Sequence, residues 1–183
     1  MNEVMKAIRE RSSTRGFTDE KVSREMLDVL IEAALASPSG MNRQPWQFTV
    51  VEDKKVIDDF EKLHVDYLME HADDNRREVL KGRNFRTLYN APLFILISTK
   101  NGEHIVDAGI AVENIVLAAQ SIGLGSVIIG GCDVLFDDPK LGKQCEELFR
   151  FPDGYKFAVG VVIGHKAVEK DPHELDYSKV TRM

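Results

Sequence analysis

Residues 92–131 read PLFILISTKNGEHIVDAGIAVENIVLAAQSIGLGSVIIGG and form the most apolar part of the chain. The run 93–97 is too short for a buried helix and lies between breaker residues, so it predicts a central strand covered on both faces. Apolar residues recur at 3.6-residue spacing over 105–122, which predicts a long buried helix. A glycine-rich turn and a second strand over 126–129 follow. We expect this region to form the centre of the fold.

Further elements are expected on both sides of this centre. Ser23 and Asp53 stand where N-caps are expected, each before a helix with an apolar stripe. The remaining expected elements are a short N-terminal helix, strands over 47–52 and 156–163, and a helix over 139–149. No repeat or linker divides the chain. The residue pattern therefore indicates one α/β domain of four or five strands with helices on both faces.

The composition excludes several classes of protein. The chain has 183 residues, 24 Lys and Arg, 30 Asp and Glu, and a net charge of −6. An acidic chain lacks the broad cationic surface that nucleic acid requires, so no nucleic-acid partner is expected. The longest apolar runs fall far below the roughly 20 residues that span a bilayer, and the first residues are charged rather than signal-like. We expect a cytoplasmic protein without a membrane partner.

Cysteine and histidine are sparse. Cys132 and Cys145 form no CxxC pair, and the five histidines do not cluster at metal-ligand spacing. Neither a disulfide scaffold nor a metal site is therefore expected. His64 and His71 are seven residues apart and can share a helical face. We interpret that face as solvated, because the sequence supplies no third ligand.

Residues 11–15 read Arg-Ser-Ser-Thr-Arg and directly follow the expected N-terminal helix. A guanidinium group binds phosphate through two parallel hydrogen bonds, and hydroxyl groups can satisfy the remaining oxygens. This segment is a candidate phosphate site. The alternative is ordinary capping and solvation at a helix end.

Residues 37–46 read SPSGMNRQPW and form an unusual loop before a strand. Its prolines restrict the backbone, and its amide side chains offer the donor and acceptor that read the edge of a heterocycle. A planar ligand would suit such a loop. The alternative is a structural connection in which Trp46 fills the core.

Glycines gather at 123–126, Gly-Leu-Gly-Ser, and again at Gly130-Gly131. Neither the dinucleotide-binding motif nor the P-loop motif is present. Glycines at a strand end let backbone N–H groups approach a flat ligand closely. The alternative is that they form tight turns only.

Taken in order, these three segments resemble the nitroreductase family of FMN-dependent oxidoreductases, in its compact branch, from residue 8 to about residue 164. The resemblance implies an α+β fold with a central, mainly antiparallel sheet flanked by helices. It also implies an intertwined homodimer with two FMN sites at the subunit interface. Residues 1–183 would form a single domain whose tail, 165–183, embraces the partner.

The resemblance also implies which residues bind FMN. Those matching the phosphate and ribityl positions are Arg11, Ser12, Ser13 and Arg15. Many relatives add a basic residue of the tail, for which Lys166, Lys170 and His165 are the candidates. Those matching the lining of the flavin ring are Pro38, Ser39 and Asn42, contributed in such dimers by the other subunit. Gly130 and Gly131 match the backbone near flavin N5 and O4. Gly40 departs from the pattern, because many members have Ser there. No catalytic side chain is assigned.

The implied activity is hydride transfer from NAD(P)H to the flavin, followed by reduction of a nitroaromatic, a quinone or a similar acceptor in a ping-pong cycle. Residues 64–89 would then form a mobile lid whose candidate substrate contacts are Tyr67, Arg83, Phe85 and Arg86. For this charged segment the alternative is an exposed helix. For the protein the alternatives are a non-catalytic flavin-binding or redox-sensing protein, and an α/β protein without a cofactor.

Overall fold

The computed structural model describes residues 2–82 and 85–183, and its four strands form one sheet in the order β1-β2-β4-β3. The strands are β1 (Trp46–Val51), β2 (Leu93–Lys100), β3 (Gly125–Ile129) and β4 (Tyr155–Gly164). Every neighbouring pair of strands is antiparallel. The fold is therefore α+β, as the resemblance implied. The α/β interpretation was wrong on strand direction, because a continuous apolar strand indicates burial on both faces and not its direction.

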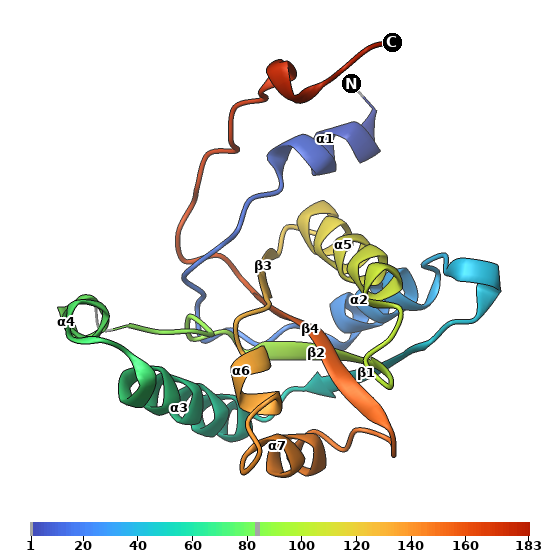
Figure 1. The fold of residues 1–183 in the computed structure, drawn as a ribbon. Helices are drawn as coiled ribbons and strands as arrows, with labels where there is room; N and C mark the ends of the chain where they lie inside the picture. The colour runs from blue at the N-terminus through green and yellow to red at the C-terminus, as the bar shows by residue number, and fades with distance from the viewer. Residues whose placement is uncertain (1, 83–84) are drawn as a thin grey trace.

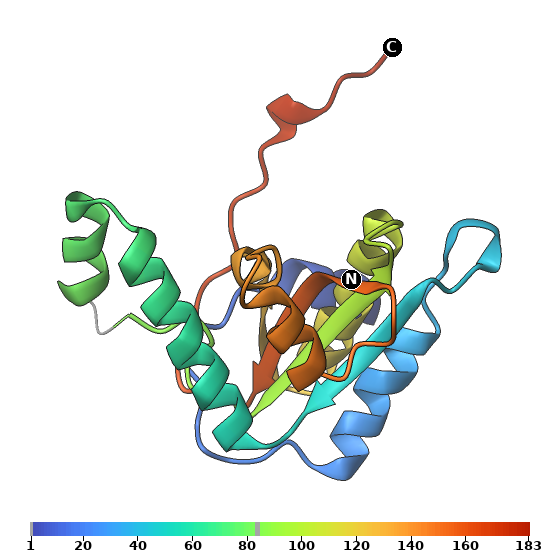
Figure 2. The same ribbon diagram turned by 60° about the horizontal axis from the view of Figure 1, so that its bottom comes forward.

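Helices cover both faces of the sheet (Figures 1 and 2). On one face lie α2 (Arg24–Leu35) and α5 (Ile105–Ser121), whose buried side chains share one apolar cluster. On the other face lie α3 (Lys54–His71), α6 (Asp133–Phe136) and α7 (Gly142–Leu148), which share a second cluster. This arrangement confirms the expected covering of the sheet on both sides.

The central strand β2 explains why residues 93–97 are continuously apolar. All of β2 except its last residue is buried. Ile95 and Ile97 enter the cluster beneath α2 and α5, whereas Phe94 and Leu96 enter the cluster beneath α3, α6 and α7. Successive side chains of a strand point to opposite faces, so both faces require apolar residues here.

Several helix boundaries follow from local hydrogen bonds. The Ser23 hydroxyl accepts from the Met26 N–H at 3.2 Å, which confirms this N-cap. Asp53 likewise caps α3 through the Lys55 N–H. The helix expected over 139–149 begins later, at Gly142, because the Asp138 carboxylate accepts the N–H groups of the next residues and forms a turn first.

Three segments extend beyond this body: the loop that contains the short 3-10 helix η1 (Gly40–Asn42), the α3–α4 hairpin with α4 (Asp74–Gly82), and the tail with η2 (Tyr177–Lys179) (Figures 1 and 2). The N-terminal helix α1 (Glu3–Glu10) packs beside α5. The tail first pairs with residues 16–18, and residues 167–183 are exposed. Within the described residues, no helix is both long and apolar enough to cross a bilayer.

Candidate functional site

The Arg-rich segment 11–15 lies along the edge strand β3. Ser13 forms a parallel bridge with Ser126, and the Thr14 N–H donates to the Ser126 carbonyl oxygen at 2.9 Å. A Cβ atom at Gly125 would lie 2.7 Å from both the Thr14 hydroxyl oxygen and Lys166 Cγ. Glycine at 125 therefore lets the Arg-rich segment and the start of the tail approach β3 closely.

The cations of this segment are available to a ligand. Among the described residues, no carboxylate forms an ion pair with Arg11 or Arg15, although other arginines do form such pairs. Ser12 donates from its hydroxyl to the Lys170 carbonyl at 3.0 Å, which ties the tail to the segment. The Lys166 ammonium lies 3.4 Å from the Gln120 amide oxygen and 3.8 Å from a carboxylate oxygen of the exposed Glu169. Several positive groups thus gather beside β3.

A cavity of about 280 Å³ opens where β3 ends. It is lined by Arg15, His64, Leu68, Arg76, Phe85, Thr87, Tyr89 and residues 127–131. The cavity therefore joins the Arg-rich segment to Gly130 and Gly131, two motifs that the resemblance assigned to one ligand. Of the expected lid contacts, Phe85 lies on this cavity and Arg83 lies outside the described residues.

Gly130 and Gly131 are not required by their protein surroundings. A Cβ atom at either position would meet no other atom within 4 Å, and neither residue has a φ angle in the left-handed region. Among the described residues, neither backbone N–H has an acceptor outside regular secondary structure. Space and free donors at a strand end are what a flat, polar ligand needs, so these residues fit a heterocycle with acceptor atoms.

His64 is a functional candidate that the sequence interpretation missed. The residue is 3% exposed, so the expectation of a solvated His64/His71 face was wrong for His64. Its Nε2 atom lies 2.9 Å from the Gly131 carbonyl oxygen, and burial lowers the pKa of the ring. His71 is exposed and stacks on Tyr67. The available signal was spacing, because residues 57, 60 and 64 share the apolar face of α3.

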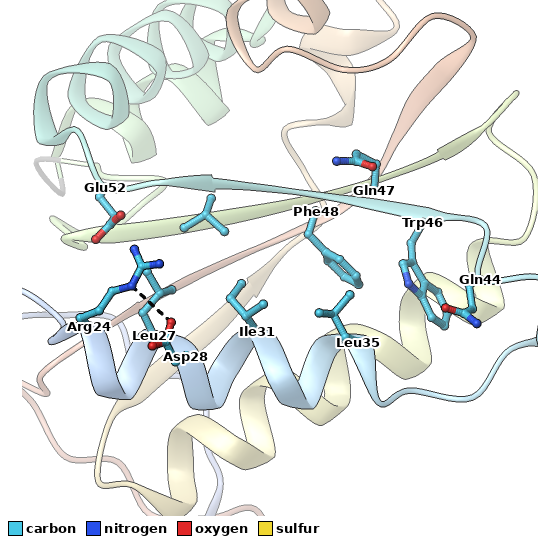
Figure 3. Close-up of a pocket in the computed structure, with 11 residues that line it drawn as sticks. Arg24, Leu27, Asp28, Ile31, Leu35, Gln44, Trp46, Gln47, Phe48 and Glu52 are labelled. Atoms are coloured by element: carbon cyan, nitrogen blue, oxygen red, sulfur yellow. Dashed lines mark ion pairs between the residues drawn. The ribbon is translucent and has the colours of Figure 1, made fainter.

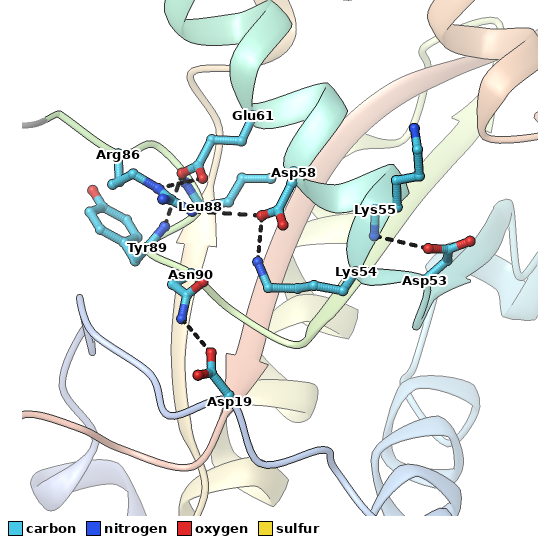
Figure 4. A network of polar contacts seen from close by, with 10 residues as sticks. All are labelled: Asp19, Asp53, Lys54, Lys55, Asp58, Glu61, Arg86, Leu88, Tyr89 and Asn90. Carbon is cyan, nitrogen blue, oxygen red and sulfur yellow. Dashed lines mark hydrogen bonds and ion pairs between the residues drawn. The ribbon is translucent and has the colours of Figure 1, made fainter.

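A buried carboxylate holds the loop that forms another wall of the cavity (Figure 4). Glu61 Oε1 accepts the backbone N–H groups of Leu88 at 2.5 Å and Tyr89 at 3.2 Å. Tyr89 and Asn90 have positive φ angles of 57° and 63°. Consecutive N–H groups around an anion form a nest, which stabilises this uncommon backbone and sets the position of the Tyr89 side chain.

The loop before β1 is fastened by its own polar groups. Ser39 Oγ accepts the Gln44 N–H at 2.8 Å, and Asn42 Oδ1 accepts from the Gln44 side chain at 3.1 Å. Asn42 and Gln44 have positive φ angles of 53° and 47°, a conformation that needs such support. The Gly40 N–H donates to Asp107 on α5 at 3.2 Å. Trp46 is buried in the core, so the structural alternative holds for this residue.

One chain does not bring this loop to the cavity. The loop leads into β1 and the cavity lies at the end of β3, and these strands are at opposite edges of the sheet (Figure 1). Pro38, Ser39 and Asn42 are therefore separated from Arg15 and Gly130 within this chain.

The cysteines offer no nucleophile. Cys132 and Cys145 are both buried in the cluster beneath α3. Burial raises the pKa of both thiols, and that of Cys145 to about 11. Both thiols are therefore protonated near neutral pH, whereas the thiolate is the reactive form.

Comparisons with known proteins agree with this geometry. A model of the nitroreductase family matches residues 8–165. A crystal structure of a nitroreductase with bound FMN from Desulfitobacterium hafniense DCB-2 is 35% identical, with a TM-score of 0.93 and coverage of 100% of this chain and 99% of that one. An FMN reductase [NAD(P)H] of Bacillus subtilis is 34% identical over 91% of this chain and 67% of the relative. An iodotyrosine deiodinase of Thermotoga neapolitana is 31% identical over 86% of this chain and 85% of the relative.

Proposed function

Because the chain belongs to the nitroreductase family, we propose that it is an FMN-dependent oxidoreductase that uses NAD(P)H to reduce small acceptors such as nitroaromatics or quinones. The observation that carries this proposal is that one cavity is lined both by Arg15 and by Gly130 and Gly131, beside which the protein leaves space. A cationic group at one side and free N–H donors at the other suit a ligand that combines a phosphate with a polar ring.

The phosphate and ribityl chain are assigned to the positive groups beside β3. Arg11 and Arg15 supply guanidinium groups without carboxylate partners among the described residues, and Ser12 and Ser13 supply hydroxyls. Lys166 adds an ammonium group that is held near Gln120 and flanks the same segment. Together these residues would compensate the phosphate charge.

The flavin ring is assigned to the glycine turn, which is Gly130-Gly131 at the end of β3. Bound FMN would supply two-electron redox chemistry between NAD(P)H and a second substrate that uses the same space, as a ping-pong cycle requires. The backbone N–H groups at Gly130 and Gly131 would donate toward the ring and stabilise the negative charge that reduction places there. Phe85 and Tyr89 supply aromatic walls that exclude water from the reacting face.

Of the segment 64–89 expected to form a lid, we assign the lid to its described parts α4 and residues 85–89. α4 is largely exposed and lies apart from the sheet, which suits a mobile cover (Figures 1 and 2). Two of the expected acceptor contacts are engaged elsewhere, because Arg86 pairs with Glu61 and Tyr67 stacks on His71. Phe85 and Arg76, which both line the cavity, are the better candidates for contact with the acceptor.

The complete site is assigned to a homodimer. A groove of about 540 Å³ runs between α2 and the edge strand β1, and its middle is lined by Ile31, Leu35 and Phe48 (Figure 3). The exposed tail carries apolar side chains at Leu175, Tyr177 and Val180. An apolar groove beside an unpaired strand edge is a ready surface for an extended apolar segment, so the tail of a second copy is its proposed occupant.

The same dimer would complete the flavin site. Pro38, Ser39 and Asn42 lie on a projecting loop that cannot reach the cavity of its own chain. In a two-fold dimer each loop would reach the partner's cavity and present the Asn42 amide to the edge of the ring. Gly40, which replaces a common Ser, contributes its N–H to Asp107 instead of a hydroxyl to the ring.

Anaerobic absorbance spectroscopy of the purified, FMN-loaded protein tests the activity. We expect the flavin absorbance band at about 450 nm to bleach on addition of NADH or NADPH and to return on addition of a quinone or a nitroarene. A flavin that binds but stays oxidised in excess of both nucleotides would show a flavin-binding protein without this activity. A protein that binds no FMN would contradict the proposal entirely.

A further inference from the structure

The glycine turn after β3 needs an anchor outside itself. Two consecutive glycines have soft φ and ψ angles and no side chains to pack, so their peptide groups are free to rotate unless other groups hold them. The Gly130 carbonyl oxygen accepts the Asp133 N–H at 3.0 Å, which fixes the first peptide group. The second peptide group has a different partner, the imidazole of His64 on α3.

The contact between His64 and Gly131 defines which nitrogen of the imidazole ring carries the proton. A carbonyl oxygen only accepts hydrogen bonds, so the Nε2 atom, which lies 2.9 Å from it, carries the proton. The Nδ1 atom is then the unprotonated nitrogen, and it is buried without a partner among the described residues. A second proton on Nδ1 would be buried without an acceptor, so the neutral ring suits this site.

Fixing the two carbonyl groups also directs two N–H groups. The peptide bond is planar and trans, so an N–H points opposite to the carbonyl of the same peptide group. The Gly131 N–H is therefore directed away from Asp133, and the Cys132 N–H is directed away from His64. Neither N–H has a backbone acceptor among the described residues. Because Gly131 lines the cavity, the contact with α3 fixes the backbone of a cavity-lining residue.

We propose that His64 is a positioning residue of the flavin site: its Nε2–H group holds the Gly131 carbonyl and thereby fixes the backbone of the glycine turn that lines the cavity. This inference rests on the proposed function for the identity of the ligand. It assigns to His64 no contact with substrate and no proton transfer. Its effect passes through the backbone of the turn to the cofactor.

Two substitutions separate the hydrogen bond from the bulk of the ring. The amide nitrogen of Gln can occupy the position of His Nε2, whereas the shorter Asn reaches only as far as Nδ1. We expect His64→Asn to weaken FMN binding by apo protein about tenfold, and His64→Gln to stay within about threefold of wild type, as the loss and rescue of one hydrogen bond predict. His71→Asn, at the exposed end of α3, is the matched control and should bind as wild type.

The midpoint potential of bound FMN gives a readout that general destabilisation does not move. The N–H groups of the fixed turn should favour reduced FMN. His64→Asn should then lower this potential by about 30 mV for each tenfold loss in the ratio of the affinity for reduced FMN to the affinity for oxidised FMN. His64→Gln should restore it. Equal affinities and equal potentials in the Asn and Gln variants would overturn the proposal.

A measurement on apo protein separates this proposal from the proposed function. Amide hydrogen exchange across residues 130–133 should be about tenfold faster in His64→Asn than in wild type, with or without a flavin. Nitrogen NMR of wild-type protein should show the Nε2–H tautomer of His64, which requires no variant. An Nδ1–H tautomer, or unchanged exchange, would overturn the anchor. Absence of FMN binding by wild-type protein would instead reject the proposed function.

Discussion

The Nε atom of Arg86 lies 2.7 Å from Oε2 of Glu61, and this pair joins α3 to the loop that precedes β2 (Figure 4). The Glu61 side chain is 5% exposed, whereas the guanidinium reaches solvent and also meets Asp58 at 3.6 Å. The other Glu61 oxygen holds two backbone N–H groups. One carboxylate therefore fixes the cavity wall that carries Phe85 and Tyr89.

Replacement of Glu61 by Gln should destabilise the fold by about 1–3 kcal/mol, because an amide cannot accept at both positions and leaves a buried polar group unpaired. Asp58→Asn removes an exposed partner of the same arginine and should cost about 0–1 kcal/mol. Urea unfolding of the two variants measures both values. Equal losses would show that the buried contacts of Glu61 do not hold the loop.

Replacement of Gly131 by Ala should separate flavin binding from stability. A Cβ at this position meets nothing in the protein, so the free energy of unfolding should stay within about 0.5 kcal/mol of wild type. FMN affinity should fall about tenfold or more, because the methyl group would occupy the space of the ring. Fluorescence titration of apo protein with FMN and urea unfolding provide the two values.

Gly160→Ala is the opposite control for that experiment. A Cβ there would lie 2.6 Å from the ring of Phe94, so this variant should lose about 1–3 kcal/mol of stability. If Gly131→Ala binds FMN as tightly as wild type, the assignment of this turn to the flavin ring is wrong.

Removal of both guanidinium groups, by Arg11→Ala together with Arg15→Ala, should weaken FMN binding strongly. Each charge-assisted phosphate contact contributes about 1.5–3 kcal/mol, which corresponds to at least a tenfold loss per arginine. Riboflavin lacks the phosphate, so its affinity should change little. Lys143→Ala, which removes an exposed cation on α7, is the control. Retained FMN affinity in the double variant would refute the phosphate site.

The buried His64 ring should make stability depend on pH. Burial lowers its pKa from the ordinary value of 6.5, although the hydrogen bond with the Gly131 backbone and the charges of Asp133 and Glu61 oppose this shift. Arg15 and Arg76 line the same cavity. The unfolded chain therefore binds a proton that the folded chain excludes. The contribution of His64 to the free energy of unfolding is fully present above about pH 6.5. It is lost as pH falls toward the pKa of the folded state, by up to about 1.4 kcal/mol per pH unit.

Urea unfolding of wild type and His64→Gln between about pH 7.5 and about pH 5.5 checks this sign, since the carboxylates titrate equally in both proteins. The wild type should lose more stability than the variant over this interval. Parallel pH profiles would mean that His64 is not excluded from protonation by the fold.

Much of the fold was predictable because its signals are local. The apolar run of β2, the periodicity of α5 and the caps Ser23 and Asp53 each depend on neighbouring residues, and the structure confirms them. Strand direction was not predictable from burial. The tail was recognisable as lacking its own core, and the structure leaves residues 167–183 exposed.

The site was predictable only where motifs are contiguous. The Arg-rich segment and the glycine turn were both recognised, and the structure places Arg15, Gly130 and Gly131 on one cavity. His64 and Glu61 were missed because their roles depend on contacts with residues 67 and 27 positions away. Such contacts arise from packing of α3 against the sheet. The spacing of residues 57, 60 and 64 marks the buried face of α3 but not the partners that this face meets.

Mixing two defective variants tests most directly whether two chains share each flavin site. One variant carries Arg11→Ala and Arg15→Ala, and the other carries Ser39→Ala and Asn42→Gly, where glycine keeps the positive φ angle without strain. Each homodimer should bind FMN weakly. A heterodimer, purified through two different tags, would combine an intact Arg-rich segment with an intact loop at one of its two sites.

The account predicts that this heterodimer binds one FMN with wild-type affinity, that its other site stays empty at the same concentration, and that the bound flavin is bleached by NADH or NADPH. A heterodimer that binds FMN no better than either parent would contradict the account, because each site would then be built within a single chain.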